Sequence, residues 1–283
     1  MTKVERILAG IDLGPDTERV LAYASFFSKL WNATIDLLYV IDYLVTPPAY
    51  MMPYLEEEKE SALRSMRRWQ ELLYNLGINA KSEVLLGRLY ESFDFSLKNL
   101  NADLLILGYR THPMRRSSSE KLIKGLDIPM LVVKGQKSED ARLGEVTIKR
   151  ILCPVDFSEH SRKALVFASN LSAITDSSLD IIHVLPVHLL KEKGEKGLVA
   201  VEEMTKEAKE MMKRLLEELS ISFADVTILS GEPHKGIISF ALDKDTDLII
   251  IGARGLGMIK GILLGSVSEA VLRSSPCPVM IVR

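Results

Sequence analysis

The sequence predicts an α/β fold of two tandem parallel-sheet domains, each with helices on both faces of its sheet. A first observation is a repeat: RILAGIDLGPDTERVLAYASFFSKLWNATIDLLYVID from Arg6 aligns without a gap with RILCPVDFSEHSRKALVFASNLSAITDSSLDIIHVLP from Arg150. A second is that each copy alternates short runs of Ile, Val and Leu with longer helical patterns, which is typical of βαβ units. The chain has 283 residues, so each copy has about 140, enough for a core of its own.

The repeat continues at the same offset of 144 residues farther along the chain. LLGRLYESFDFSLKNLNADLLILGYR from Leu85 aligns with LSGEPHKGIISFALDKDTDLIIIGAR from Leu229. So long a period indicates duplicated domains rather than a solenoid. The stretch between the copies, GQKSEDARLGEVTI, is polar and charged, as in a linker. We therefore expect domains at 1–137 and 149–283, joined by a linker at 138–148.

The second copy shows the order of elements most clearly. Strands are expected near 150–156, 179–185, 224–229, 247–252 and 278–282. Ser158 is a favoured N-cap residue and predicts the start of the first helix. Another helix has apolar residues at steps of three and four, which predict one buried face. They are Val201, Met204, Ala208, Met211, Leu215 and Leu219.

Composition excludes several classes of protein. The formal charge of −2 and the pI of about 6.3 argue against a nucleic-acid partner, which would need a basic face. Cys153 and Cys277 lie in apolar runs without metal-ligand spacing, so we interpret them as buried hydrophobes in a reducing compartment. The start of the chain has no apolar leader, and its apolar runs are shorter than the roughly 18 residues that span a bilayer. We expect a cytoplasmic protein without a membrane partner.

A glycine-rich loop follows the fourth strand of the second copy and precedes the helical segment SVSEAVLR. Its glycines are Gly252, Gly255, Gly257, Gly261 and Gly265. Parallel sheets bind ligands at the carboxyl ends of their strands. Glycine allows positive φ and close approach of N–H groups to phosphate, a helix start offers unpaired N–H donors, and Arg254 adds a cation. The loop therefore favours a phosphate site, with a turn whose glycines only relieve crowding as the alternative.

The spacing Gly252-x2-Gly255-x9-Gly265-Ser266 resembles the nucleotide motif of the universal stress protein family. It is neither a P-loop nor a GxGxxG fingerprint. The segments RILCPVDFSEHSRKAL, IIHVLP, GEPHKGIISFA, DTDLIIIGARG and GSVSEAVLRSSPCPVMIVR resemble the same family in the same order. The resemblance covers nearly the whole chain, twice. It implies a Rossmann-like, HUP-type sheet of five parallel strands in the order 3-2-1-4-5, which reverses between the strands that end at Asp156 and Gly252.

The resemblance also implies an ATP site in the second copy. The residues that match the family's site are Pro154, Val155, Asp156, Val184, Gly252, Arg254, Gly255, Gly265, Ser266, Val267 and Ser268. Asp156 is also explained as a cap of the first helix, and Arg254 as a solvated loop charge. Magnesium is expected with the triphosphate, because no acidic cluster of the protein is built to hold a metal by itself.

The first copy departs from this pattern. Asp12, Val40, Gly108 and Arg110 take the equivalent places, but Thr111 replaces Gly255. The loop of this copy is five residues shorter, and alignment back from Ser119 places Arg116 at the position of Gly265. Side chains at both places would fill the space of the phosphates. We expect one ATP per chain.

Three functions remain open from the sequence: an ATP-binding regulatory or stress-response protein, a slow ATPase or adenine-nucleotide hydrolase, and a nucleotide-free interaction protein. No GxSxG or HExxH motif is present, and the five histidines share no ligand spacing. We therefore assign no catalytic residue, although Ser266 and Ser268 are possible phosphoryl acceptors. Intact glycine spacing favours the first function.

The last strand of each copy predicts how the domains associate. The segments 128–133 and 277–283 are apolar and take the edge of the sheet in the implied strand order. Exposed edges of this kind pair with other strands. Relatives commonly dimerise through this strand, so we expect an intramolecular pseudo-dimer, with association of two chains as a further possibility.

Overall fold

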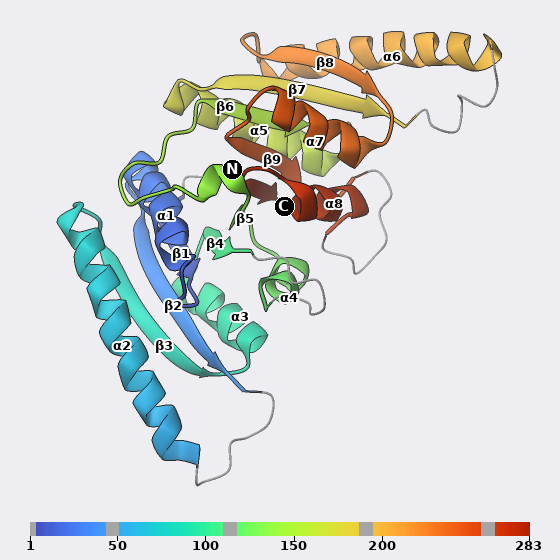
Figure 1. Cartoon of the computed structure of the whole chain (residues 1–283). Coiled ribbons are helices and arrows are strands. Elements are labelled where there is room, and N and C mark those ends of the chain that lie inside the picture. Colours follow the sequence, from blue (N-terminus) through green and yellow to red (C-terminus); the bar gives the residue numbers. More distant parts are fainter. Residues whose placement is uncertain (1–3, 44–50, 110–117, 187–194, 256–263) are drawn as a thin grey trace. The chain divides into compact units, whose positions relative to one another are not determined.

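The chain folds as two α/β units, which the computed structural model places at residues 2–147 and 148–283. Figure 1 labels their elements. The structure describes residues 4–43, 51–109, 118–186, 195–255 and 264–283. The segment expected as a linker, 138–148, belongs to the first unit up to residue 147. Arg142 of this segment lies 4.0 Å from the Glu18 carboxylate of the same unit.

The first unit contains one parallel sheet in the order β3-β2-β1-β4-β5. Its strands are β1 (Arg6–Gly10), β2 (Thr34–Asp42), β3 (Ala80–Gly87), β4 (Leu104–Gly108) and β5 (Met130–Val133). Its helices are α1 (Thr17–Trp31), α2 (Met52–Asn75), α3 (Leu89–Leu100) and α4 (Ser118–Gly125), followed by a 3₁₀ turn at Gln136–Ser138.

The second unit repeats this topology with strand order β8-β7-β6-β9-β10, again all parallel. Its strands are β6 (Arg150–Pro154), β7 (Ser178–Leu185), β8 (Asp225–Ser230), β9 (Leu248–Gly252) and β10 (Val279–Val282). Its helices are α5 (Glu159–Thr175), α6 (Glu195–Leu219), α7 (Pro233–Asp243) and α8 (Ser266–Ser274). The predicted fold class and strand order are therefore confirmed.

The same hydrogen bond forms inside each unit, at positions separated by the offset that the sequence predicts. The N–H of Arg6 donates to Asp103 Oδ2, and the N–H of Arg150 donates to Asp247 Oδ2, both at 3.0 Å. Each aspartate thereby joins the start of the first strand of its unit to the start of the fourth. The same polar contact stabilises both copies, so the duplication extends to tertiary structure.

The core of the second unit lies between the sheet and its helices. Every residue of β9 is buried, as expected for a central strand of a parallel sheet covered on both faces. The prediction for α6 was wrong at one position: Met211 is 48% exposed, and Met212 is buried at 1%. Met212 follows Ala208 by four residues and precedes Leu215 by three, so it continues the same apolar stripe. In the described part of the chain, no helix is long and apolar enough to cross a bilayer.

Candidate functional site

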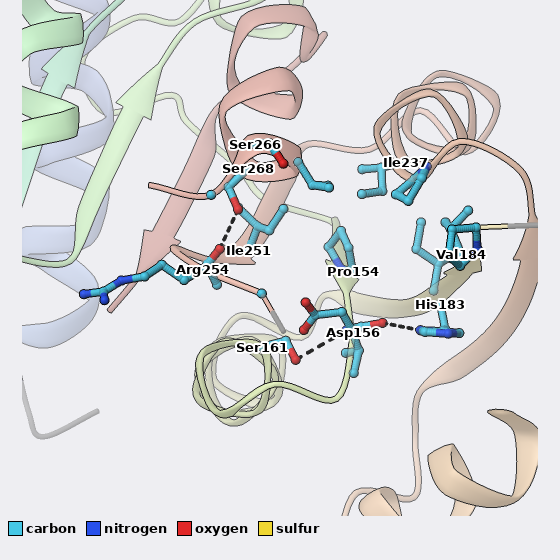
Figure 2. A pocket seen from close by; sticks show the side chains of 18 residues that line it. Pro154, Asp156, Ser161, His183, Val184, Ile237, Ile251, Arg254, Ser266 and Ser268 are labelled. Atoms are coloured by element: carbon cyan, nitrogen blue, oxygen red, sulfur yellow. Dashed lines mark hydrogen bonds between the residues drawn. The ribbon is translucent and has the colours of Figure 1, made fainter. Parts of the chain in front are cut away.

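A pocket of about 300 Å³ lies at the carboxyl ends of β6, β7 and β9 in the second unit (Figure 2). This is the switch point, where the strand order reverses between β6 and β9. The structure brings together every predicted site residue in its lining: Pro154, Val155, Asp156, Val184, Gly252, Arg254, Gly255, Gly265, Ser266, Val267 and Ser268. The sequence did not single out the other lining residues: Ser161, Ile182, His183, Pro186, Pro233, Ile237 and Ile251.

Asp156 forms a tight turn between β6 and α5. Its Oδ1 accepts the N–H of Ser158 at 3.1 Å, and the intervening Phe157 takes a left-handed φ of 65°. In the first unit, Asp12 Oδ1 accepts the N–H of Gly14 at 2.8 Å. The aspartate therefore has the same structural role in both units. The second oxygen, Asp156 Oδ2, is not needed for the turn.

Ser158 caps α5, as the sequence predicts, and joins the helix to the glycine loop. Its Oγ accepts the N–H of Ser161 at 3.2 Å and donates to the carbonyl oxygen of Arg254 at 3.2 Å. A single hydroxyl therefore completes the helix start and fixes the backbone at the beginning of the loop.

Two of the loop glycines are required by packing within the protein. A Cβ on Gly252 would lie 2.6 Å from the carbonyl carbon of His160 and 2.7 Å from the backbone nitrogen of Ser161. A Cβ on Gly255 would lie 2.2 Å from Asp156 Oδ2. Neither glycine has a left-handed φ, so the positive φ that glycine allows is not used at either position. They are small because the first turn of α5 and the Asp156 carboxylate lie against them.

Gly265 differs from the other two. Its backbone is extended, with φ −74° and ψ 158°, a conformation that any residue adopts. The nearest protein atoms to a Cβ on Gly265 would be 3.5 Å away, an ordinary contact. Nothing in the described part of the protein therefore requires glycine here. A side chain at this position would occupy the pocket that the residue lines.

The first turn of α8 faces the same pocket. Among the described residues no side chain caps this helix, and the Gly265 carbonyl oxygen accepts the N–H of Glu269 at 2.8 Å, which is the first hydrogen bond of the helix. The N–H groups of the first turn have no acceptor within a helix, so they suit an anion. Ser268 is buried, and its Oγ donates to the carbonyl oxygen of Gly252 at 2.8 Å. That hydroxyl therefore holds α8 against the end of β9, whereas Ser266 is exposed.

Arg254 lines the pocket, but its side chain extends away from Asp156 and Pro154 (Figure 2). The buried Nε atom of Arg254 has no hydrogen-bond partner among the described residues. The backbone of this residue is fixed through Ser158. The guanidinium would have to turn inward to contact a ligand beside Asp156.

The opposite end of the pocket is apolar. Val184 and Ile237 are 8% and 3% exposed and come from β7 and α7; Figure 2 shows them together, apart from the serines of α8. His183, which precedes Val184 in β7, donates its Nδ1–H to the carbonyl oxygen of Val155 at 2.7 Å. Its ring lies 4.7 Å from that of Phe157, centroid to centroid. The pocket therefore has an apolar end and a polar end with a carboxylate between them.

The first unit packs this region differently. Gly10 takes the place of Pro154, and a Cβ on Gly10 would lie 2.5 Å from Leu107 Cδ2 and 2.7 Å from Phe93 Cε1. Phe93 and Leu107 correspond to Ile237 and Ile251 at the offset of 144 residues. In the first unit, these two side chains lie directly on the backbone of β1, where the second unit places a proline ring.

A hydrogen bond that forms in both units agrees with a shorter loop in the first unit. Ser119 Oγ donates to the carbonyl oxygen of Gly108 at 2.6 Å over 11 residues, whereas the equivalent bond from Ser268 to Gly252 spans 16. The difference equals the five missing residues of the sequence alignment. Three residues to which the sequence assigns a role in this loop, Arg110, Thr111 and Arg116, lie outside the described residues.

Comparisons with known proteins agree on one family. The model of the universal stress protein family matches residues 3–134 and 147–283. Universal stress protein MJ0577 of Methanocaldococcus jannaschii is 34% identical over 157 residues, which cover 49% of this chain and 96% of that protein. A universal stress protein of Mycolicibacterium smegmatis is 24% identical over 298 residues, covering 98% of this chain and 96% of its own.

A solved structure matches both units together. The crystal structure of a universal stress protein from Archaeoglobus fulgidus aligns with a TM-score of 0.75 at 26% identity, covering 98% of each chain. The Methanocaldococcus relative is about as long as one half of this chain, whereas the Mycolicibacterium and Archaeoglobus relatives are about as long as the whole. The tandem arrangement is therefore shared with other members.

Proposed function

The chain belongs to the universal stress protein family, and we propose that the pocket of its second unit binds one ATP per chain. The observation that carries this proposal is Gly265. The described residues leave room for a side chain there, yet the residue is a glycine directly before the start of α8, which no described side chain caps. A ligand that approaches the backbone closely explains the missing side chain, and phosphate is the ligand that a helix start favours.

The two ends of the pocket fit the two ends of a nucleotide. The apolar surface of Val184 and Ile237 would hold the base, and the phosphates would meet the N–H groups of Ser266 and Val267 in α8. Asp156 Oδ2, which the turn leaves unused, would accept hydrogen bonds from ribose hydroxyls. Arg254, whose Nε has no hydrogen-bond partner among the described residues, would reach the phosphates after its side chain turns toward the pocket, since a guanidinium favours phosphate oxygens.

Magnesium would enter with the triphosphate. Among the described residues, no group of three or more His, Cys, Asp and Glu side chains is placed to hold a metal ion. Mg²⁺ commonly keeps several waters and takes its remaining ligands from substrate phosphates. The protein would therefore bind the Mg·ATP complex through the nucleotide.

We propose a regulatory role in the stress response, in which nucleotide occupancy changes the shape or partners of the protein. Binding needs only the groups described above, and the described pocket offers no nucleophile with a neighbouring base. We place this role in the cytoplasm, where the free, buried thiols of Cys153 and Cys277 would stay reduced.

We further propose that the two units form an intramolecular pseudo-dimer through their last strands. Within its own unit, β5 lies at the edge of the sheet beside β4, and β10 lies at the edge beside β9. Amide hydrogen exchange in the intact chain would test this pairing. Slow exchange of every amide of β5 would support it, and fast exchange of the amides that do not bond to β4 would contradict it.

Nucleotide analysis of the purified protein tests the binding proposal. We expect denaturation to release an adenine nucleotide, identified by ultraviolet absorbance and mass spectrometry. Added Mg·ATP should also raise the melting temperature, because a ligand that binds the folded state stabilises it. A protein that releases no adenine nucleotide and is not stabilised by Mg·ATP would contradict the proposal.

A further inference from the structure

The two units differ at one position of the pocket rim in a way that changes its charge. In the first unit, Asp42 ends β2, and its Oδ1 accepts the N–H of Leu89 at 3.1 Å. Leu89 is the first residue of α3. The equivalent residues of the second unit, 144 positions on, are Pro186 and Pro233. Pro233 opens α7, and both prolines line the pocket.

Helix geometry explains why the two positions change together. The N–H of the first residue of a helix has no acceptor inside the helix, so Asp42 satisfies the N–H of Leu89. Proline has no N–H and is well suited to the first helical position. With Pro233 in place, position 186 has no donor to satisfy and can lose its carboxylate. The two prolines thus remove a negative charge from the rim without leaving a backbone donor unpaired.

Few charged side chains lie among the described residues that line the pocket. Among its lining residues, Asp156 carries a negative charge and Arg254 a positive one. Glu232, which precedes Pro233, forms an ion pair with Lys235 at 2.6 Å. An anionic ligand therefore meets one lining carboxylate. An aspartate at position 186 would add a second.

We propose that Pro186 determines the charge selectivity of the pocket. An uncharged rim at this position admits a ligand with several negative charges, and an aspartate there, as at Asp42 in the first unit, disfavours it by repulsion. The inference rests on the proposed function, because it names a determinant of the same nucleotide site. Pro186 follows Val184 at the apolar end of the pocket, so a carboxylate there would act on the phosphates through space and not by contact.

The test compares Pro186→Asp with Pro186→Asn, which differ in charge and hardly in shape. Pro233 is kept, so the new carboxylate finds no N–H at residue 233. Calorimetry with Mg·ATP should show several-fold weaker binding for the aspartate variant than for the asparagine variant at low salt. The difference should shrink as salt rises, because screening weakens the repulsion. Adenosine, which has no phosphate, should bind both variants equally.

Three results would overturn the proposal. They are equal Mg·ATP affinity of the two variants at low salt, equal weakening of both relative to the unaltered protein, and a loss for adenosine as large as that for Mg·ATP. The pair Pro186→Glu and Pro186→Gln repeats the comparison if the first pair does not fold. Failure of the unaltered protein to bind Mg·ATP would instead contradict the proposed function, so the two failures are distinguishable.

Discussion

The Asp156 carboxylate occupies the space in which a side chain on Gly255 would begin, since a Cβ there would lie 2.2 Å from Asp156 Oδ2. Gly255 is therefore small because of a neighbour within the protein. Gly265 has no such neighbour in the part of the chain that the structure describes, where the nearest atoms to a Cβ would be 3.5 Å away. We therefore expect substitution at 255 to move Asp156, and substitution at 265 to leave the described neighbours in place and to affect only the proposed nucleotide.

Gly265→Arg should abolish Mg·ATP binding with little change in melting temperature. Its extended backbone accepts any residue, and the long side chain would project into the pocket. Gly265→Ala is the matched control for the fold, because its Cβ makes only ordinary contacts. Thermal denaturation and calorimetry of both variants check the prediction. A folded arginine variant with unchanged affinity would contradict the role of Gly265.

Asp156→Ala should weaken Mg·ATP binding by about tenfold, or about 1.4 kcal/mol. The variant also loses the hydrogen bond from the N–H of Ser158, which should cost about 1 kcal/mol of folding stability. Asp12→Ala is the matched control, because it removes the equivalent hydrogen bond in the first unit. We expect both variants to lose similar stability in urea denaturation. If Asp12→Ala lowers affinity as much as Asp156→Ala, the aspartate acts through the fold and not on the ligand.

Ile237→Phe should lower nucleotide affinity by filling the apolar end of the pocket. Ile237 is buried and lines the pocket, and the larger ring is the residue found at the equivalent Phe93. Ile237→Leu conserves side-chain volume and should bind nearly as tightly as the unaltered protein. Competition with a fluorescent ATP analogue would measure both. Equal affinities for the phenylalanine and leucine variants would show that the base does not contact this wall.

The sequence predicted the parts of the site that follow a linear pattern. Glycine spacing identified Gly252, Gly255 and Gly265, and the count back from Ser119 placed the missing five residues of the first loop correctly. The sequence did not show why glycine is needed at these positions, because the atoms that crowd Gly252 belong to α5, about 90 residues earlier. The predicted roles of these residues in nucleotide binding stay predictions.

The sequence pattern did not predict which side chains pack against the strands of the sheet. Phe93 lies on Gly10, but the two residues are far apart in the chain and neither belongs to a motif. The error at Met211 has a different cause. Met211 and Met212 both fit steps of three and four between Ala208 and Leu215, so the spacing alone does not choose between them; in the structure Met212 is buried and Met211 is exposed.

The stability of the protein should depend on the protonation of Asp180. Burial raises the pKa of Asp180 above its ordinary value, so the folded state binds this proton more tightly than the unfolded state. In the unfolded chain the pKa of an aspartate is about 3.9. As the pH rises from that value through the raised pKa of the folded state, the contribution of Asp180 to stability falls, and it stays low at higher pH. Asp180→Asn should be more stable than the unaltered protein near neutral pH and show no such gain at the acid end.

Asp36→Asn is the matched control for that measurement. Asp36 occupies the equivalent position in the first unit and forms an ion pair with Arg6, whose Nε lies 3.0 Å from Asp36 Oδ2. Loss of this ion pair should lower the free energy of unfolding by about 1 kcal/mol near neutral pH. Urea denaturation across a series of pH values would measure both variants. A stabilised Asp36→Asn, or an Asp180→Asn without gain near neutral pH, would contradict this account of the two aspartates.

The central claim is that one chain binds one Mg·ATP in its second unit. Calorimetric titration of nucleotide-free protein with Mg·ATP tests this most directly, because it gives the stoichiometry without any substitution. We expect about one site per chain, since the first unit has a shortened loop after Gly108 and places Phe93 over Gly10. Two equivalent sites per chain, or no heat of binding accompanied by no change in melting temperature, would contradict the claim.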